Sequence, residues 1–206
     1  MPRLPFGDDP GSNKIHKIPH DGEKMKLKIP FGRTIQNKIR MMKLQRYIYS
    51  QNWTFSDSRI AMILSEMQDW RKNYLPIDID GKIVLDAGAG EGETALFYLS
   101  YGAKKVICIE PSVDCHVNLF RNADKFPIIP VTEPFSISML DFDYDFMKMD
   151  IEGYEESLLN VDLDKPAVIE IHGQQQFEKF EKKGWKVKKS RISETVTCTA
   201  YGYWMC

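Results

Sequence analysis

The segment 82–110 constrains the fold of this chain more than any other part of the sequence. It opens with the short apolar run 83–85, which is typical of a parallel strand covered on both faces. Asp86 and a glycine-rich turn follow, and the chain continues with apolar residues at helical spacing. A second apolar run, 106–109, ends on Glu110. This succession of strand, turn, helix and strand predicts a βαβ unit and therefore a parallel sheet.

The glycines of the turn stand at alternate positions, Gly88, Gly90 and Gly92. They let the backbone bend sharply and let a ligand approach where a Cβ would collide. Glu110 lies about twenty positions further on, where a carboxylate meets a ribose diol in nucleotide-binding βαβ units. A dinucleotide fingerprint would place a third glycine at position 93, which is Glu93. Together with Glu91, this acid would repel a pyrophosphate at the start of the helix.

The spacing D-x-G-x-G-x-G resembles motif I of the class I S-adenosylmethionine-dependent methyltransferases. The resemblance implies a Rossmann-like α/β sheet, mostly parallel with a terminal antiparallel hairpin, and S-adenosyl-L-methionine as cofactor. Its loop would pass the amino-acid part of the cofactor, and Glu110 would take the ribose hydroxyls. The cofactor-binding residues implied here are Asp86, Gly88, Ala89, Gly90, Gly92, Glu110 and Pro111. An acid after the third strand would bind adenine, with Glu133 as the candidate and Asp141 and Asp143 as competitors. The alternative is a purely structural turn in an unrelated α/β protein.

Composition fits one α/β domain with an appendage. The chain has 206 residues, of which 43% are hydrophobic, so it is long and apolar enough for a well-buried core. Its four cysteines form no C-x-x-C pair and no zinc spacing, which indicates reduced thiols. No apolar run approaches the ~18 residues of a membrane span, and we recognise no signal-peptide core near residue 1. We therefore expect a cytoplasmic protein.

Charge divides the chain. Residues 1–50 hold eleven Lys or Arg against four acids, a net charge of +7, whereas residues 51–206 carry −8. We predict a basic N-terminal arm and helix over 1–50 and a methyltransferase domain over 51–206. The predicted helix 33–49 either packs its apolar line on the domain or binds RNA, a membrane or an acidic partner.

Further elements follow from periodicity. A helix over 56–74 is predicted from the spacing of Ile60, Ile63, Leu64 and Met67, and it leads into the first strand. Methyltransferases often carry a helix at this position that covers the cofactor. Val113, Val117 and Phe120 indicate a second crossover helix. Strands are expected over 128–131, 145–149 and 167–171, a helix over 174–185, and a hairpin over 185–191 and 195–205. Trp53 and Phe55 are expected either to line the cofactor cover or to belong to the core.

Asp86, Glu110, Asp150, Glu152 and His172 each follow a predicted strand, at the edge where open parallel sheets bind ligands. The segment 147–155, MKMDIEGYE, resembles the K-x-D-x-E-G-x-E signature of the FkbM-type methyltransferases, and VIEIHG resembles that family's I-E-x-H segment. The resemblance covers residues 80–175. It implies methyl transfer to a hydroxyl oxygen of a sugar or of another small or polymeric metabolite.

Such a reaction needs an acceptor positioned in line with the methyl group and a base for its proton. His172 suits the base, because a neutral imidazole accepts a proton near pH 7; the alternative is a structural histidine. Asp150 would orient the imidazole, take the proton or hold the acceptor, and Glu152 either joins it or serves as a first-turn acid. These three residues would also suit a divalent metal, although their spacing does not require one, and no metal site is predicted.

Two other functions are consistent with the sequence. An RNA methyltransferase would use the basic arm to bind phosphates. The N/D-P-P-Y/F motif of base-amino methylation is absent after the fourth predicted strand, which leaves ribose oxygens and ring atoms as targets. A non-catalytic module would bind S-adenosylmethionine without turnover.

Overall fold

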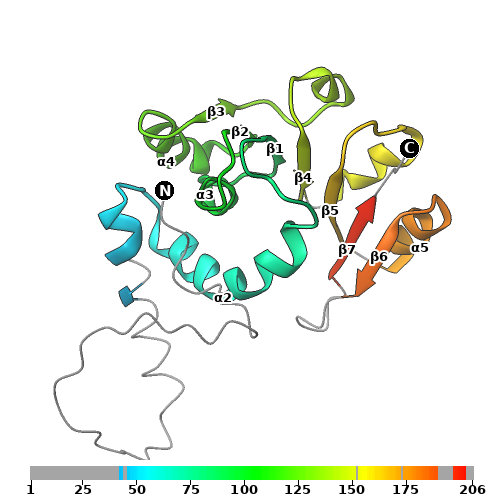
Figure 1. Cartoon of the computed structure of the whole chain (residues 1–206), viewed down its shortest axis with the longest axis horizontal. Helices are drawn as coiled ribbons and strands as arrows, with labels where there is room; N and C mark the ends of the chain where they lie inside the picture. The colour runs from blue at the N-terminus through cyan, green and yellow to red at the C-terminus, as the bar shows by residue number, and fades with distance from the viewer. Residues whose placement is uncertain (1–41, 44–45, 152, 173, 190–196, 203–206) are drawn as a thin grey trace, which may run out of the picture.

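The computed structural model describes residues 42–43, 46–151, 153–172, 174–189 and 197–202. Its centre is a parallel sheet of five strands, in the order β3 (Ile128–Val131), β2 (Lys105–Ile109), β1 (Ile83–Ala87), β4 (Phe146–Met149) and β5 (Ala167–His172). These strands confirm the predicted Rossmann-like α/β sheet (Figure 1). Beyond β5, the strands β7 (Thr197–Gly202) and β6 (Lys186–Lys189) continue the sheet with antiparallel pairing. The residues between them, 190–196, lie outside the described part.

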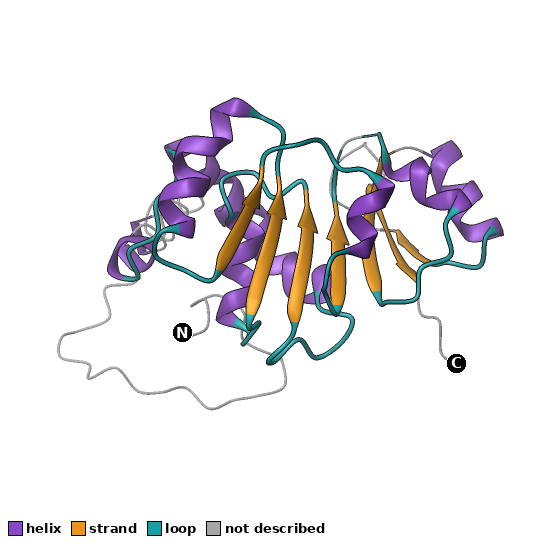
Figure 2. Ribbon diagram, turned by 90° about the horizontal axis from the view of Figure 1, so that it is seen from above, coloured by secondary structure: helices purple, strands orange, loops and turns teal. Residues whose placement is uncertain are grey.

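Strand order reverses beside β1. The chain runs from β1 to β2 and β3 on one side and then returns to place β4 on the other side of β1. The parallel strands end at the same edge of the sheet (Figure 2). A crevice for a ligand forms where the strand order reverses, outside the carboxyl ends of the strands. In this protein that point lies between β1 and β4.

Helices cover both faces of the sheet. The elements are α2 (Asp57–Tyr74), α3 (Glu93–Ser100), α4 (Val113–Ala123), α5 (Gln174–Lys182) and the 3-10 helices η1 (Ile137–Asp141) and η2 (Glu155–Asn160). Because successive strand residues point to opposite faces, two cores form. Val84 and Phe146 belong to the core shared with α2 and α3, whereas Leu85 and Met147 belong to the core shared with η1, η2 and α5. Cover on both faces explains the continuous apolar runs of the strands.

The helix predicted over 56–74 is confirmed as α2, with Ser56 at its N-cap position. Its predicted apolar residues Ile60, Ile63 and Met67 are buried. α2 packs on α3, where the rings of Trp70 and Phe97 lie 5.7 Å apart, and every residue of α3 is buried. The helix before the first strand is therefore a structural layer over the glycine-loop helix.

The second crossover helix is confirmed as α4, but the three apolar residues that indicated it do not form its buried face. Val113, Val117 and Phe120 are 76%, 59% and 45% exposed, while Cys115, Leu119 and Asn122 are buried. The inward face of α4 packs partly on a polar chain segment, so a buried asparagine takes a place that a hydrophobicity pattern assigns to an apolar residue.

The N-terminal part of the described chain leads into α2. Residues 42–43 and 46–50 are helical, and all but residue 50 fall within the helix predicted over 33–49. Trp53 and Phe55 are buried in the core, and Trp53 stacks on Phe126 with ring centroids 4.1 Å apart. The predicted arm up to residue 41 lies outside the described part. None of the described helices is long and apolar enough to cross a membrane.

Candidate cofactor and acceptor site

The glycine turn lies between the carboxyl ends of β2 and β4 and is hydrogen-bonded to β2. The backbone N–H groups of Gly88 and Ala89 donate to the carbonyl of Ile109 at 2.9 and 3.2 Å. On the other side, the N–H of Asp150 donates to the carbonyl of Ala87 at 2.9 Å. The predicted loop residues, Glu110 and Asp150 therefore meet at one edge of the sheet, at the point where the strand order reverses.

Glycine is required at two positions of this turn. Gly88 has φ +79°, and a Cβ there would lie 1.8 Å from the carbonyl oxygen of Asp150. Gly90 has φ +56°, and a Cβ there would lie 2.5 Å from a carboxylate oxygen of Glu93. The left-handed backbone disfavours a side chain at both positions, and at Gly88 the backbone of Asp150 leaves no space for one. The turn is thus packed directly against the end of β4, where the predicted acceptor residues begin.

Glu110 is held in place by backbone donors from two sides. One carboxylate oxygen accepts from the N–H of Gly90 and the other from the N–H of Ser112, both at 2.8 Å. Its side chain is at the border of the interior, with 9% of the residue exposed. An ionised carboxylate has about four acceptor positions, so two remain for further donors. A ribose diol supplies two hydroxyl donors, and the arrangement around Glu110 fits that group.

Lys148 stands at the centre of the site, and sequence reasoning did not select it. Its ammonium lies 3.2 Å from the carboxylate of Asp86 and 3.9 Å from that of Asp150, and it donates to the carbonyl of Gly88 at 3.0 Å. The residue is 2% exposed. Burial alone would lower the pKa of Lys148, but the charges of Asp86 and Asp150 raise it above the ordinary value. A charged lysine therefore joins β1, the glycine turn and the end of β4.

The carboxylate of Asp86 has its partners inside the protein. Its carboxylate pairs with Lys148 and accepts a hydrogen bond from the hydroxyl of Thr94 in α3. Asp86 is fully buried, so its contacts are with the protein interior. A lysine inside the otherwise apolar strand FMKM is the sequence signal that could have found this pair, because a buried lysine needs a buried acid.

Helix α2 brings further acids to the same face of the sheet. The hydroxyl of Tyr74 donates to the carboxylate of Glu170 in β5, and the ammonium of Lys148 lies 5.8 Å from the Tyr74 ring centroid. Burial raises the pKa of Glu66, and the charges of Glu170 and Asp150 raise it further. Asp150 therefore has Glu66 and Glu170 as acidic neighbours in addition to the Lys148 ammonium.

The remaining predicted residues differ in where they lie relative to the glycine turn. Pro111 and Glu133 are exposed and follow β2 and β3, so they lie at the same edge. The competing acids Asp141 and Asp143 are exposed in and after η1. His172 is the last residue of β5. Glu152 lies outside the described residues.

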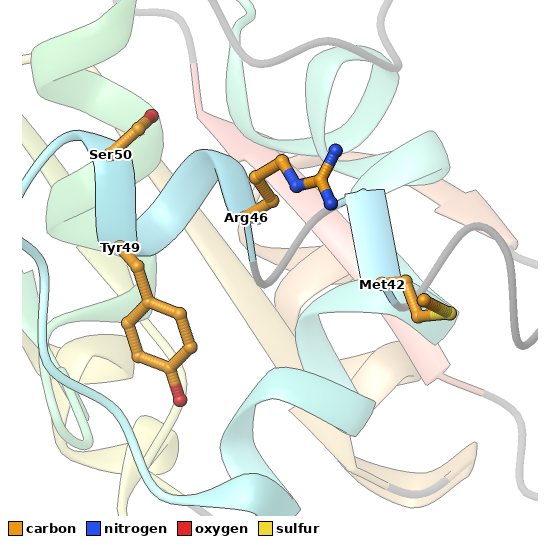
Figure 3. Close-up of a pocket in the computed structure, with 4 residues that line it drawn as sticks. All are labelled: Met42, Arg46, Tyr49 and Ser50. Carbon is orange, nitrogen blue, oxygen red and sulfur yellow. The ribbon is translucent and has the colours of Figure 1, made fainter.

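A separate pocket of about 580 Å³ is lined by Met42, Arg46, Tyr49 and Ser50, on the helical segment before α2 (Figure 3). None of these residues belongs to the predicted site. Within the described part of the chain, no group of three or more His, Cys, Asp or Glu side chains is arranged to hold a metal ion.

Neither a family model nor a curated protein sequence matches this chain. Solved structures do match it. Precorrin-6y C5,15-methyltransferase from Geobacter metallireducens aligns with a TM-score of 0.52 at 13% identity, over 74% of this chain and 94% of that one. Ribosomal protein L11 methylase from Lactobacillus delbrueckii subsp. bulgaricus aligns with a TM-score of 0.52 at 16% identity, over 66% and 78%.

Fibrillarin from Aeropyrum pernix, solved with natively bound S-adenosyl-L-methionine, aligns with a TM-score of 0.51 at 12% identity, over 66% of this chain and 73% of that one. At these identities the matches show the fold. The chain has a fold similar to that of the class I S-adenosylmethionine-dependent methyltransferases.

Proposed function

We propose that this protein is an S-adenosylmethionine-dependent methyltransferase of the FkbM type that methylates a hydroxyl oxygen of a sugar or another hydroxyl-rich metabolite. The observation that carries the proposal is the fixed carboxylate of Glu110 beside the turn of Gly88 and Gly90, at the reversal of strand order. This is the geometry expected where a ribose diol meets a nucleoside-binding βαβ unit. The signature segments around Asp150 and His172 support the family.

The bound cofactor would supply a methyl group already activated on a sulfonium. The residues of this chain would then have to bind the cofactor and orient the acceptor. Glu110 would accept the ribose hydroxyls, Pro111 would border the nucleoside, and Glu133 would accept from the adenine amino group. Gly88, Ala89, Gly90 and Gly92 would leave room for the amino-acid part. Asp86, being fully buried, would act through Lys148 and the turn.

On the acceptor side, His172 would take the hydroxyl proton as general base. Asp150 would orient the imidazole, take the proton or hold the acceptor, and Glu152 would either join it or serve as a first-turn acid. The Lys148 ammonium lies 3.9 Å from the Asp150 carboxylate and forms an ion pair with it. A carboxylate accepts hydrogen bonds, which suits contact of Asp150 with substrate hydroxyls.

The acids near Asp150 support a hydroxyl-rich acceptor over RNA. Glu66, Asp150 and Glu170 lie close enough to interact electrostatically. Carboxyl groups accept hydrogen bonds from hydroxyls, whereas carboxylates repel phosphates. RNA methylation through the basic arm remains the second candidate because residues 1–50 carry a net charge of +7. A salt-dependent gel shift with tRNA that disappears on deletion of residues 1–50 would favour this candidate.

Calorimetry with S-adenosyl-L-homocysteine, the demethylated product, tests the proposal. Glu110→Ala should weaken binding by ~2 kcal/mol, or about 30-fold, because charge-assisted hydrogen bonds to the diol are lost. Glu156→Ala is the matched control: it removes an exposed carboxylate that pairs with Lys179 and should leave the affinity unchanged. Absence of binding to the wild-type protein would refute the proposal, and equal affinity of Glu110→Ala would refute the role of Glu110.

A further inference from the structure

We infer that Asn122 of α4 is a positioning residue for the cofactor: it fixes the glycine turn by joining it to the chain segment that precedes α2. The inference rests on the proposed function, since it concerns the same turn. Asn122 is fully buried, and its side chain lies among polar backbone groups rather than apolar ones.

One amide group makes three hydrogen bonds. The oxygen of Asn122 accepts from the N–H of Thr54 at 2.8 Å, and its nitrogen donates to the carbonyls of Thr54 at 2.9 Å and of Glu91 at 3.0 Å. Both donor positions of the amide are therefore used. Thr54 and Glu91 lie far apart in the sequence, and Asn122 is the group through which they are joined.

Glu91 is held a second time, through its side chain. Its carboxylate accepts from the backbone N–H of Ser56 at 2.7 Å and from the amide of Asn118 at 3.0 Å. Glu91 stands between Gly90 and Gly92 in the turn. The carbonyl of Glu91 is thus held by α4, and its carboxylate is held by α4 and by Ser56. These contacts continue into α2, where Arg59 pairs with Glu93 at 3.1 Å.

The contacts of Glu91 affect the cofactor site through the neighbouring residue Gly90. Gly90 donates its backbone N–H to Glu110, and Gly88, Gly90 and Gly92 all have positive φ. Glycine has a wide choice of backbone conformations, so such a turn needs outside contacts to hold one of them. If Glu91 is released, the N–H of Gly90 can move off Glu110, and the carboxylate loses the donor that orients it toward the ribose.

The decisive comparison is Asn122→Leu with a control of similar stability loss. Leucine keeps a side chain of similar size and removes all three hydrogen bonds. Ile79→Ala leaves a cavity just before β1 and removes none of the hydrogen bonds that hold the turn, so it measures the effect of destabilisation. Asn118→Ala removes one contact to the Glu91 carboxylate from a half-buried position and serves as the milder variant if Asn122→Leu does not fold.

We expect Asn122→Leu to bind S-adenosyl-L-homocysteine about tenfold more weakly. This change in affinity corresponds to the free energy of about one hydrogen bond. Hydrogen exchange of the Gly90 and Gly92 amides should accelerate in the free protein, and Asn118→Ala should show both effects to a smaller extent. Ile79→Ala should show neither at a comparable drop in Tm.

The outcomes separate the two proposals. If the wild-type protein binds the probe, and the Asn122 or Asn118 variant matches Ile79→Ala in affinity and in exchange, the positioning role is refuted while the proposed function stands. If the wild-type protein does not bind, the proposed function fails and the inference fails with it.

Discussion

Replacing Lys148 with methionine gives the sharpest test of the site's electrostatics. Methionine keeps an unbranched stem of similar length and removes the ammonium. Asp86, which is fully buried, then loses its ion-pair partner, and the carbonyl of Gly88 loses a donor. Removing one partner of a buried ion pair costs about 3–5 kcal/mol, because the remaining charge stays in the interior. That is a large part of the roughly 5–15 kcal/mol that stabilises a typical domain.

The loss should depend on pH in a defined direction. Burial already raises the pKa of Asp86, and the Lys148 charge opposes that rise. Without Lys148, the pKa of Asp86 in the folded state rises further above its value in the unfolded state. The protonated Asp86 therefore favours the folded state at low pH, and this contribution is lost as pH rises. The deficit of Lys148→Met relative to wild type should therefore shrink between about pH 7 and about pH 5.

Urea unfolding at both pH values measures this deficit. A double variant, Lys148→Met with Asp86→Asn, removes both charges and should recover more than half of the loss at neutral pH. The reasoning is refuted if Lys148→Met loses less than about 1 kcal/mol, or if the double variant is as unstable as the single one.

Two further predictions concern Glu93 and His172. Burial raises the pKa of Glu93 to about 7, so the protonated side chain stabilises the fold at low pH and this stability is lost as pH rises through about 7. Relative to Glu93→Gln, the unfolding free energy of the wild-type protein should fall by about 2–3 kcal/mol between about pH 5 and about pH 8. Parallel pH profiles of the two proteins would contradict this prediction. His172→Ala should cut turnover by ~10² or more with nearly unchanged affinity for S-adenosyl-L-homocysteine, because a general base acts on the acceptor, and full activity in a methyl-transfer assay would exclude that role.

The local parts of the fold could be read from the sequence because their signals are local. The segment around Gly88 and Glu110 showed a strand, a turn and a helix in order, and the strand over 128–131 was predicted with the observed bounds. α2 was found from the spacing of its apolar residues, since one helical face repeats at a fixed period.

Other features were missed because they depend on which groups pack against a residue in the folded protein. Val117 and Phe120 fit an apolar helix line, yet α4 turns Asn122 inward, because the segment at Thr54 presents backbone groups that need partners. Lys148 was treated only as part of a signature, because a lysine between apolar residues is usually read as an exposed position.

By itself, the sequence determined the order of the elements and the turn at which they bend, since periodicity and glycine act over a few neighbouring residues. Only the tertiary structure decided which polar groups meet. Lys148 is paired with Asp86, and Asn122 joins Thr54 to Glu91, because strand pairing and helix packing bring distant residues into the same buried space. There each charge or donor needs a partner, and no local pattern names that partner.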